Sequence, residues 1–150
     1  MRMRADSGPC FRLFAAAMLA LVAASSQAAA CSCQPNPSAG EILASASAVF
    51  SGIVEENTPA AEGQSVTIFR VTESFKGVST GTTVRVRHPS GSSASCGVTF
   101  APGEIRTLAA YRTGPGAPLT ASLCSTWMFL PHVPLSKQLI EQMREMRLRP

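Results

Sequence analysis

The side chains best suited to chemistry in this sequence are four cysteines, two of which are only one residue apart. Cys31 and Cys33 come directly after a run of alanines, and Cys96 and Cys124 follow much later in the chain. Paired thiols form disulfides in an oxidising compartment, whereas reduced thiolates bind soft metals such as Cu(I). The compartment therefore decides which chemistry applies, and the residues before Cys31 indicate the compartment.

The first thirty residues have the three parts of an export signal. Three arginines lie near the start, Phe11–Ala24 is almost wholly apolar, and Ala28–Ala30 offers the small side chains that signal peptidase accepts. The apolar stretch is shorter than the roughly 20 residues that cross a bilayer, and no later stretch approaches that length. We therefore predict a signal peptide at residues 1–30, no transmembrane segment, and one mature domain at residues 31–150 in a secreted or periplasmic location.

Charge and composition argue against two classes of function. Removal of the signal lowers the formal net charge from +4 to +2, because three Arg and Asp6 leave with it. Nucleic-acid binding usually needs a strong, clustered positive charge, so we expect no nucleic-acid partner. The mature chain has no Asp, and we expect its two histidines, His88 and His132, to be surface or structural residues. Because no usual Ser-His-Asp set can form, we expect that the protein is not an enzyme.

The cysteines of the mature chain are even in number, which favours two disulfides after Cys10 leaves with the signal. A bridge between Cys31 and Cys33 is disfavoured, because their Cα atoms would lie about 6.5 to 7 Å apart in an extended segment. We favour Cys31 with Cys96 and Cys33 with Cys124, and the crossed pairing stays open. Oxidised sulfurs do not bind copper, so we expect no cofactor.

The elements that position the cysteines can be predicted from capping and turn signals. Ser38 and Glu41 form a capping box before a short helix that ends near Ser47, and apolar residues at helical spacing predict a second helix over residues 136–149. Glycines and prolines separate five strands predicted over residues 48–55, 66–75, 82–88, 105–112 and 119–125.

Two details of these strands bear on packing. Residues 48–55 carry apolar side chains on both faces, and Gly52 indicates a bulge or a close backbone contact. Arg85 and Arg87 alternate with valines, which is typical of the solvated face of an antiparallel strand and needs no polyanion partner. Five short strands of this kind favour a mainly β chain folded as a small barrel.

The cysteine pattern and its neighbours resemble a known family. The features that carry the likeness are an amino-terminal Cys-Ser-Cys followed by prolines, a short helix, a strand such as residues 48–54, and the segment Ser93-Ala94-Ser95-Cys96. In these features the chain resembles the netrin-like module and, within it, the tissue inhibitors of metalloproteinases. The likeness covers most of the mature chain. A third bridge near Ala44 and a second cysteine-rich domain are both missing, so the chain is more similar to shortened bacterial versions.

The resemblance implies both a fold and an activity. The fold is a five-stranded OB-type Greek-key barrel with a short N-terminal helix and a C-terminal helix, and its amino-terminal segment is joined to the loop before Cys96. The activity is inhibition of zinc metalloendopeptidases by a monomer, in which the free amine and the carbonyl of Cys31 chelate the protease zinc. The residues that the resemblance places against the protease are Cys31, Ser32, Cys33, Gln34, Pro35, Ala94 and Ser95.

Two other interpretations use the same residues. The sequence before Cys31 could be a lipobox, in which case Cys31 is lipidated and anchors the protein to a membrane surface. Ala28 stands where Leu is usual, and lipidation would leave one of the remaining three cysteines unpaired. The alternative function is thus an exported or lipid-anchored OB-fold module that binds proteins or serves a structural role without inhibitory activity.

Overall fold

The computed structural model describes residues 31–33, 35–91 and 96–148, and it consists mainly of β-structure. The predicted signal peptide at residues 1–30 lies outside the described residues. The strands are β1 (Ala48–Ala60), β2 (Gln64–Lys76), β3 (Thr83–Pro89), β4 (Ile105–Ala110) and β5 (Leu119–Thr120). The helices are α2 (Ala39–Ser45), α3 (Leu123–Thr126), the 3-10 helix η2 (Trp127–Phe129) and α4 (Ser136–Leu148).

The five strands form one mixed sheet in the order β4-β1-β2-β3-β5. All neighbouring strands are antiparallel except β3 and β5, which pair in parallel at Val86 and Arg87. An isolated antiparallel bridge joins Tyr111, directly after β4, to Thr120 of β5. The predicted mainly β chain of five strands is confirmed, whereas the pairing of the named strands shows an open sheet and does not show a closed barrel.

The predicted helices and most strands lie where the sequence places them. Ser38 caps α2 as predicted: its side chain accepts a hydrogen bond from the Glu41 backbone N–H, and the Glu41 carboxylate accepts one from the Ser38 backbone N–H. The bulge predicted at Gly52 is confirmed by a register shift between Ser51 and Gly52. A Cβ at Gly52 would lie 3.0 Å from the backbone oxygen of Arg70, so the close backbone contact is real as well.

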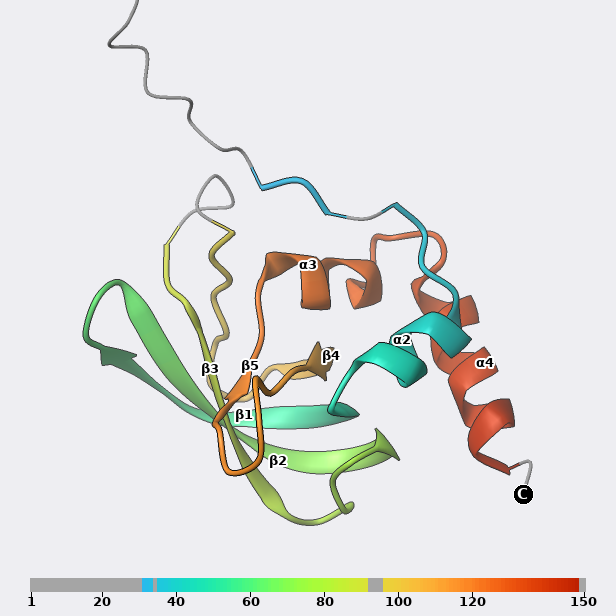
Figure 1. Ribbon diagram of the computed structural model, residues 1–150, viewed down its shortest axis with the longest axis horizontal. Helices are drawn as coiled ribbons and strands as arrows, with labels where there is room; N and C mark the ends of the chain where they lie inside the picture. The colour runs from blue at the N-terminus through green and yellow to red at the C-terminus, as the bar shows by residue number, and fades with distance from the viewer. Residues whose placement is uncertain (1–30, 34, 92–95, 149–150) are drawn as a thin grey trace, which may run out of the picture.

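Several predicted strand boundaries are wrong, and the strand predicted over residues 105–112 ends at Ala110. β1 and β2 continue as a paired hairpin as far as Ala60 and Gln64, although the apolar pattern of β1 stops at Val54, because backbone pairing continues past the end of the core. This hairpin extends beyond the rest of the sheet at the left of Figure 1. The strand predicted over residues 119–125 ends at Thr120, and α3 begins at Leu123. Ser125 explains the change, because its hydroxyl accepts a hydrogen bond from the Ser122 backbone N–H and closes a helical turn.

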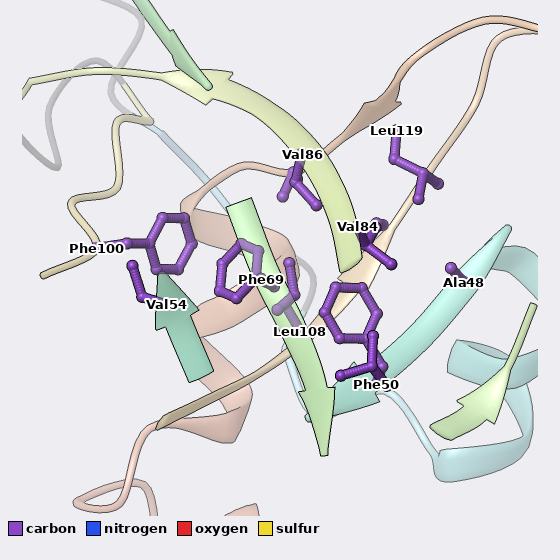
Figure 2. Close-up of a cluster of buried hydrophobic side chains, with 12 residues drawn as sticks. Ala48, Phe50, Val54, Phe69, Val84, Val86, Phe100, Leu108 and Leu119 are labelled. Carbon is purple, nitrogen blue, oxygen red and sulfur yellow. The ribbon is translucent and has the colours of Figure 1, made fainter. Parts of the chain in front are cut away.

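The main core lies on one face of the curved sheet and is built around aromatic rings. Figure 2 shows Phe50, Phe69 and Phe100 in a row, and the rings pack edge to face with centroids 5.7 Å apart for Phe50 and Phe69 and 5.1 Å apart for Phe69 and Phe100. All three side chains are fully buried. Val84 and Val86 of β3 point into the same core, while Arg85 and Arg87 are exposed as predicted.

A second core lies between the helices and the opposite face of β1, so both faces of this strand are buried as predicted. Val49 of β1 packs there with Ile42 of α2 and with Leu139 and Met143 of α4. Figure 1 shows α2 and α4 side by side at the edge of the sheet. Arg144 of α4 donates two hydrogen bonds to the Glu73 carboxylate of β2, at 2.8 Å each.

Candidate functional site

Two disulfide bonds hold the amino-terminal segment against the body of the protein. One joins Cys31 to Cys96, with Cα atoms 5.2 Å apart, and the other joins Cys33 to Cys124, with Cα atoms 5.1 Å apart. This is the pairing that we favour from the sequence over the crossed one. The bridges span 65 and 91 residues of sequence, so a short segment is tied to two distant parts of the chain.

Ser32 lies between these two attachment points and is exposed, whereas Cys31 and Cys33 are partly buried. In Figure 1 the segment is drawn in blue and passes over α3 before it enters α2. Pro35 is exposed, and Asn36 adopts the left-handed backbone conformation with φ 49°. Of the predicted binding residues 31–33 and 35, Ser32 and Pro35 are therefore exposed, and Cys31 and Cys33 are fixed by their bridges.

The two partner cysteines lie next to different elements, β3 and α3. Cys96 follows β3, and the loop that leads to it is closed by a hydrogen bond from the Val98 N–H to the Pro89 carbonyl, at 3.1 Å. Cys124 lies in α3, and the neighbouring Leu123 N–H donates to the Cys96 carbonyl at 3.0 Å. This backbone bond brings both attachment points together even without the amino-terminal segment.

The four sulfurs gather at this place. The Sγ atom of Cys31 lies 3.6 Å from the Sγ atom of Cys124, to which it is not bonded. The Sγ atoms of Cys31, Cys33 and Cys124 all lie within 4.8 Å of one another, and among the described residues they are the only cluster of three or more potential metal ligands. Because each sulfur is in a disulfide, none offers the thiolate that a metal would require.

Beside the bridge to Cys124 lies a cavity of about 280 Å³ that the sequence did not reveal. Two of its polar side chains are already bonded within α2 and its cap: Glu41 accepts from the Ser38 N–H and hydroxyl, and Ser45 donates to the Glu41 carbonyl. The hydrogen bonds from Ser38 hold the pKa of Glu41 below its usual value. The residues that line the cavity are Pro37, Glu41, Ile42, Ser45, Tyr111, Ser122, Cys124, Ser125 and Met128.

The histidines are separated and differ in environment. His132 is exposed, whereas His88 is buried in the main core, with its Nε2 atom 2.8 Å from the Thr67 hydroxyl and its ring packed edge to face on Phe100. Burial lowers the pKa of His88, and hydrogen bonding to the backbone of Pro89 and Val98 partly opposes this effect. A structural role for His88 follows from its hydrogen bonds.

The remaining predicted site residues cannot be placed against this segment. Gln34, Ala94 and Ser95 lie outside the described residues. Cys96, directly after Ala94 and Ser95, is bonded to Cys31. Within the part of the chain that the structure describes, no helix is long and apolar enough to cross a membrane.

The site therefore combines an exposed Ser32 with two neighbouring disulfides in a protein of mainly β-structure. No family model matches this chain, and no curated protein matches it.

Proposed function

We propose that the protein is an inhibitor of zinc metalloendopeptidases, whose mature amino terminus is Cys31. The observation that carries the proposal is that Ser32 is exposed between two residues that are each covalently tied to the protein. A segment held in this way can enter a protease cleft as a rigid wedge. Ser32 would then occupy the pocket beside the zinc, and the chain turns after Pro35, at Asn36.

Rigidity supports binding because it removes a cost. Each residue that becomes ordered on binding costs roughly 1 to 2 kcal/mol of backbone entropy. Bridges at Cys31 and Cys33 remove much of this cost before the protease is met, since the segment is ordered by folding. The backbone hydrogen bond from Leu123 to Cys96 supports the same rigidity, because it holds the two partner cysteines of the segment together.

The zinc chemistry needs a neutral donor at the open coordination position of a catalytic zinc. The α-amine of Cys31 has an expected pKa of about 8, so its ligating form is available near neutral pH, and the metal favours it further. Together with its own carbonyl oxygen, this amine closes a five-membered chelate ring. The mechanism requires cleavage after Ala30 by signal peptidase, export to an oxidising compartment and an unmodified Cys31.

The scaffold that we propose for the wedge is an OB-type barrel. Support comes from the Tyr111–Thr120 bridge, in which the Tyr111 N–H donates to the Thr120 carbonyl at 2.9 Å and the Thr120 N–H donates back at 2.8 Å. This bridge lies between the end of β4 and β5, which are the outer strands of the sheet. Contact between the outer strands of a sheet is what closes a small barrel, so this bridge supports the proposed fold.

The decisive experiment changes only the position of the amine. The protein is exported and processed with Cys31 as its first residue, and a second version carries one additional Ala before Cys31. Both are titrated against a panel of zinc endopeptidases. We expect inhibition by the first and at least a 100-fold loss with the second, because the added residue displaces the chelating amine.

Controls separate folding from chemistry. Circular dichroism and thiol counting should show the same fold and no free thiol in both versions, and intact mass should show an unmodified amine on the first. Equal inhibition by both versions would reject the chelation mechanism. Inhibition by neither would favour the exported binding or structural module, and acyl chains on Cys31 would favour its lipid-anchored form.

A further inference from the structure

We propose that partial reduction by an external dithiol starts a thiol–disulfide exchange between the two bridges, so that the amino-terminal segment can switch its attachment to Cys124 from Cys33 to Cys31. The inference concerns the chemistry of the four sulfurs and does not depend on protease inhibition. It assigns to the folded protein a second pairing, reached by two-electron reduction with one external dithiol, in which Cys31 is bonded to Cys124 and both Cys33 and Cys96 are free thiols.

The geometry that carries the proposal is the contact between two sulfurs of different bridges. Cys31 Sγ lies 3.6 Å from Cys124 Sγ, and Cys33 Sγ is within 4.8 Å of both. Cys31 and Cys33 are separated only by Ser32, which is exposed. A change of partner at Cys124 thus requires a movement of a few ångströms along one short segment.

The exchange needs a thiolate to start it, which a small dithiol or the dithiol of a thiol–disulfide oxidoreductase supplies. One thiolate of the dithiol attacks Cys96 Sγ, forms a mixed disulfide with it and releases Cys31 as a thiolate. The second thiolate of the dithiol then attacks the mixed disulfide, so that the dithiol leaves in its oxidised form and Cys96 becomes a free thiol. Cys31 Sγ then attacks Cys124 Sγ, the Cys33–Cys124 bond breaks, and its electron pair leaves on Cys33, which takes a proton from solvent. The attack of Cys31 on Cys124 breaks one S–S bond and forms one, so this step involves no net oxidation or reduction.

Entry through the other bridge leads to the same pairing, once the dithiol has left Cys33 in its oxidised form and Cys33 is a free thiol. If an external thiolate attacks Cys33, Cys124 is released as a thiolate that already contacts Cys31 Sγ. Its attack forms the Cys31–Cys124 bond and expels Cys96. Both routes therefore converge, and they do so because Cys31 and Cys124 are the two sulfurs in contact.

Cys96 provides a matched comparison. Its sulfur does not belong to the close group formed by Cys31, Cys33 and Cys124, so it lies more than 4.8 Å from at least one of them. A free thiol at Cys31 lies in this close group with both sulfurs of the Cys33–Cys124 bridge, so we expect it to exchange more readily than a free thiol at Cys96.

The first test compares two full-length variants that each retain one free thiol beside the Cys33–Cys124 bridge. Cys96→Ala leaves Cys31 free, and Cys31→Ala leaves Cys96 free. After folding, rapid acid quenching, alkylation and peptide sequencing by mass spectrometry, we expect label on both Cys31 and Cys33 in Cys96→Ala, each at 10% or more. In Cys31→Ala we expect label chiefly on Cys96.

The second test uses the unaltered protein, so that it does not depend on the folding of a variant. Oxidised protein is treated with substoichiometric dithiothreitol, quenched with acid and alkylated. We expect molecules labelled at both Cys33 and Cys96 and still bridged between Cys31 and Cys124. Labelling confined to the pair Cys31 and Cys96, or to the pair Cys33 and Cys124, would show reduction without exchange and would overturn the proposal, as would label on Cys31 alone in a folded Cys96→Ala variant.

Discussion

At the scale of single residues, the role of His88 is set by the fold and differs from that of its neighbours in the sequence. The same strand alternation that exposes Arg85 and Arg87 turns His88 into the core, where Thr67 and Phe100 surround it. Burial favours the neutral ring, because a charged imidazolium would lose its hydration. His88 is therefore a structural group whose protonation opposes folding.

This burial predicts a pH dependence of stability. The pKa of folded His88 is lower than the value of 6.5 for an exposed histidine, so the unfolded chain binds more protons between the two values. The free energy of unfolding should fall as the pH drops below about 6.5, and the fall should cease below the folded-state pKa. Urea denaturation at several pH values between 7 and 5 measures it.

The control for this prediction is the other histidine. His88→Gln should remove most of the change between pH 7 and 5, while His132→Gln, at an exposed position, should retain it. An unchanged pH profile in His88→Gln would contradict the assignment. Glu41 and Glu73, whose pKa values are lowered, affect stability only nearer their usual pKa of 4.5 and below, so they do not interfere.

At the scale of elements, the turn after β2 shows how closely two segments approach. Gly77 has φ 74° and lies against Ser47, the residue before β1, so that an added Cβ would overlap the Ser47 carbonyl oxygen. Gly81, in the same connection to β3, also has a positive φ, of 84°, but an added Cβ there would meet nothing within 4 Å. Both glycines have a positive φ, and they differ only in whether an added Cβ would contact other atoms.

Alanine at each of these glycines should therefore destabilise the protein by different amounts. Gly81→Ala should cost about 1 kcal/mol, since it forces an L-residue into the left-handed region. Gly77→Ala should cost at least about 2 kcal/mol more, because the backbone of Ser47 or of the turn must also shift. Urea denaturation of both variants measures the difference, and equal costs would show that the contact with Ser47 is unimportant.

At the scale of the whole molecule, the disulfides connect parts of the chain that the sheet does not pair. The Cys33–Cys124 bridge closes a segment that contains α2 and all five strands. In the chain-entropy account, closing a loop of 91 residues stabilises a fold by about 4 kcal/mol, chiefly by restricting the unfolded chain. The bridge is thus a global constraint as well as a local attachment.

Removing this bridge should lower the stability of the whole protein. We expect the double variant Cys33→Ala/Cys124→Ala to lose about 4 kcal/mol of unfolding free energy relative to the unaltered protein. Chemical denaturation under non-reducing conditions measures the loss. A loss below about 1 kcal/mol, with the Cys31–Cys96 bridge intact, would mean that the remaining bridge already restricts the unfolded chain.

Local patterns were enough to predict the capping box at Ser38, four of the five strand positions, the bulge at Gly52 and the final helix. Each depends on residues adjacent in sequence: a hydroxyl three positions before a carboxylate, or alternation along a strand. The hairpin beyond Glu55 and the turn of α3 were missed, because polar strand residues and a serine-capped turn have no apolar period.

The sequence by itself determined that two cysteines one residue apart must each bond to a distant partner, since an extended segment holds their Cα atoms too far apart to bond to each other. Only the tertiary structure decided which partners, and that Cys31 and Cys124 touch without being bonded. The physical reason is that this contact depends on the position of Cys96 after β3, on the start of α3 and on the backbone hydrogen bond from Leu123 to Cys96. These elements lie far apart along the chain, so no local sequence pattern predicts how close they are in the folded protein.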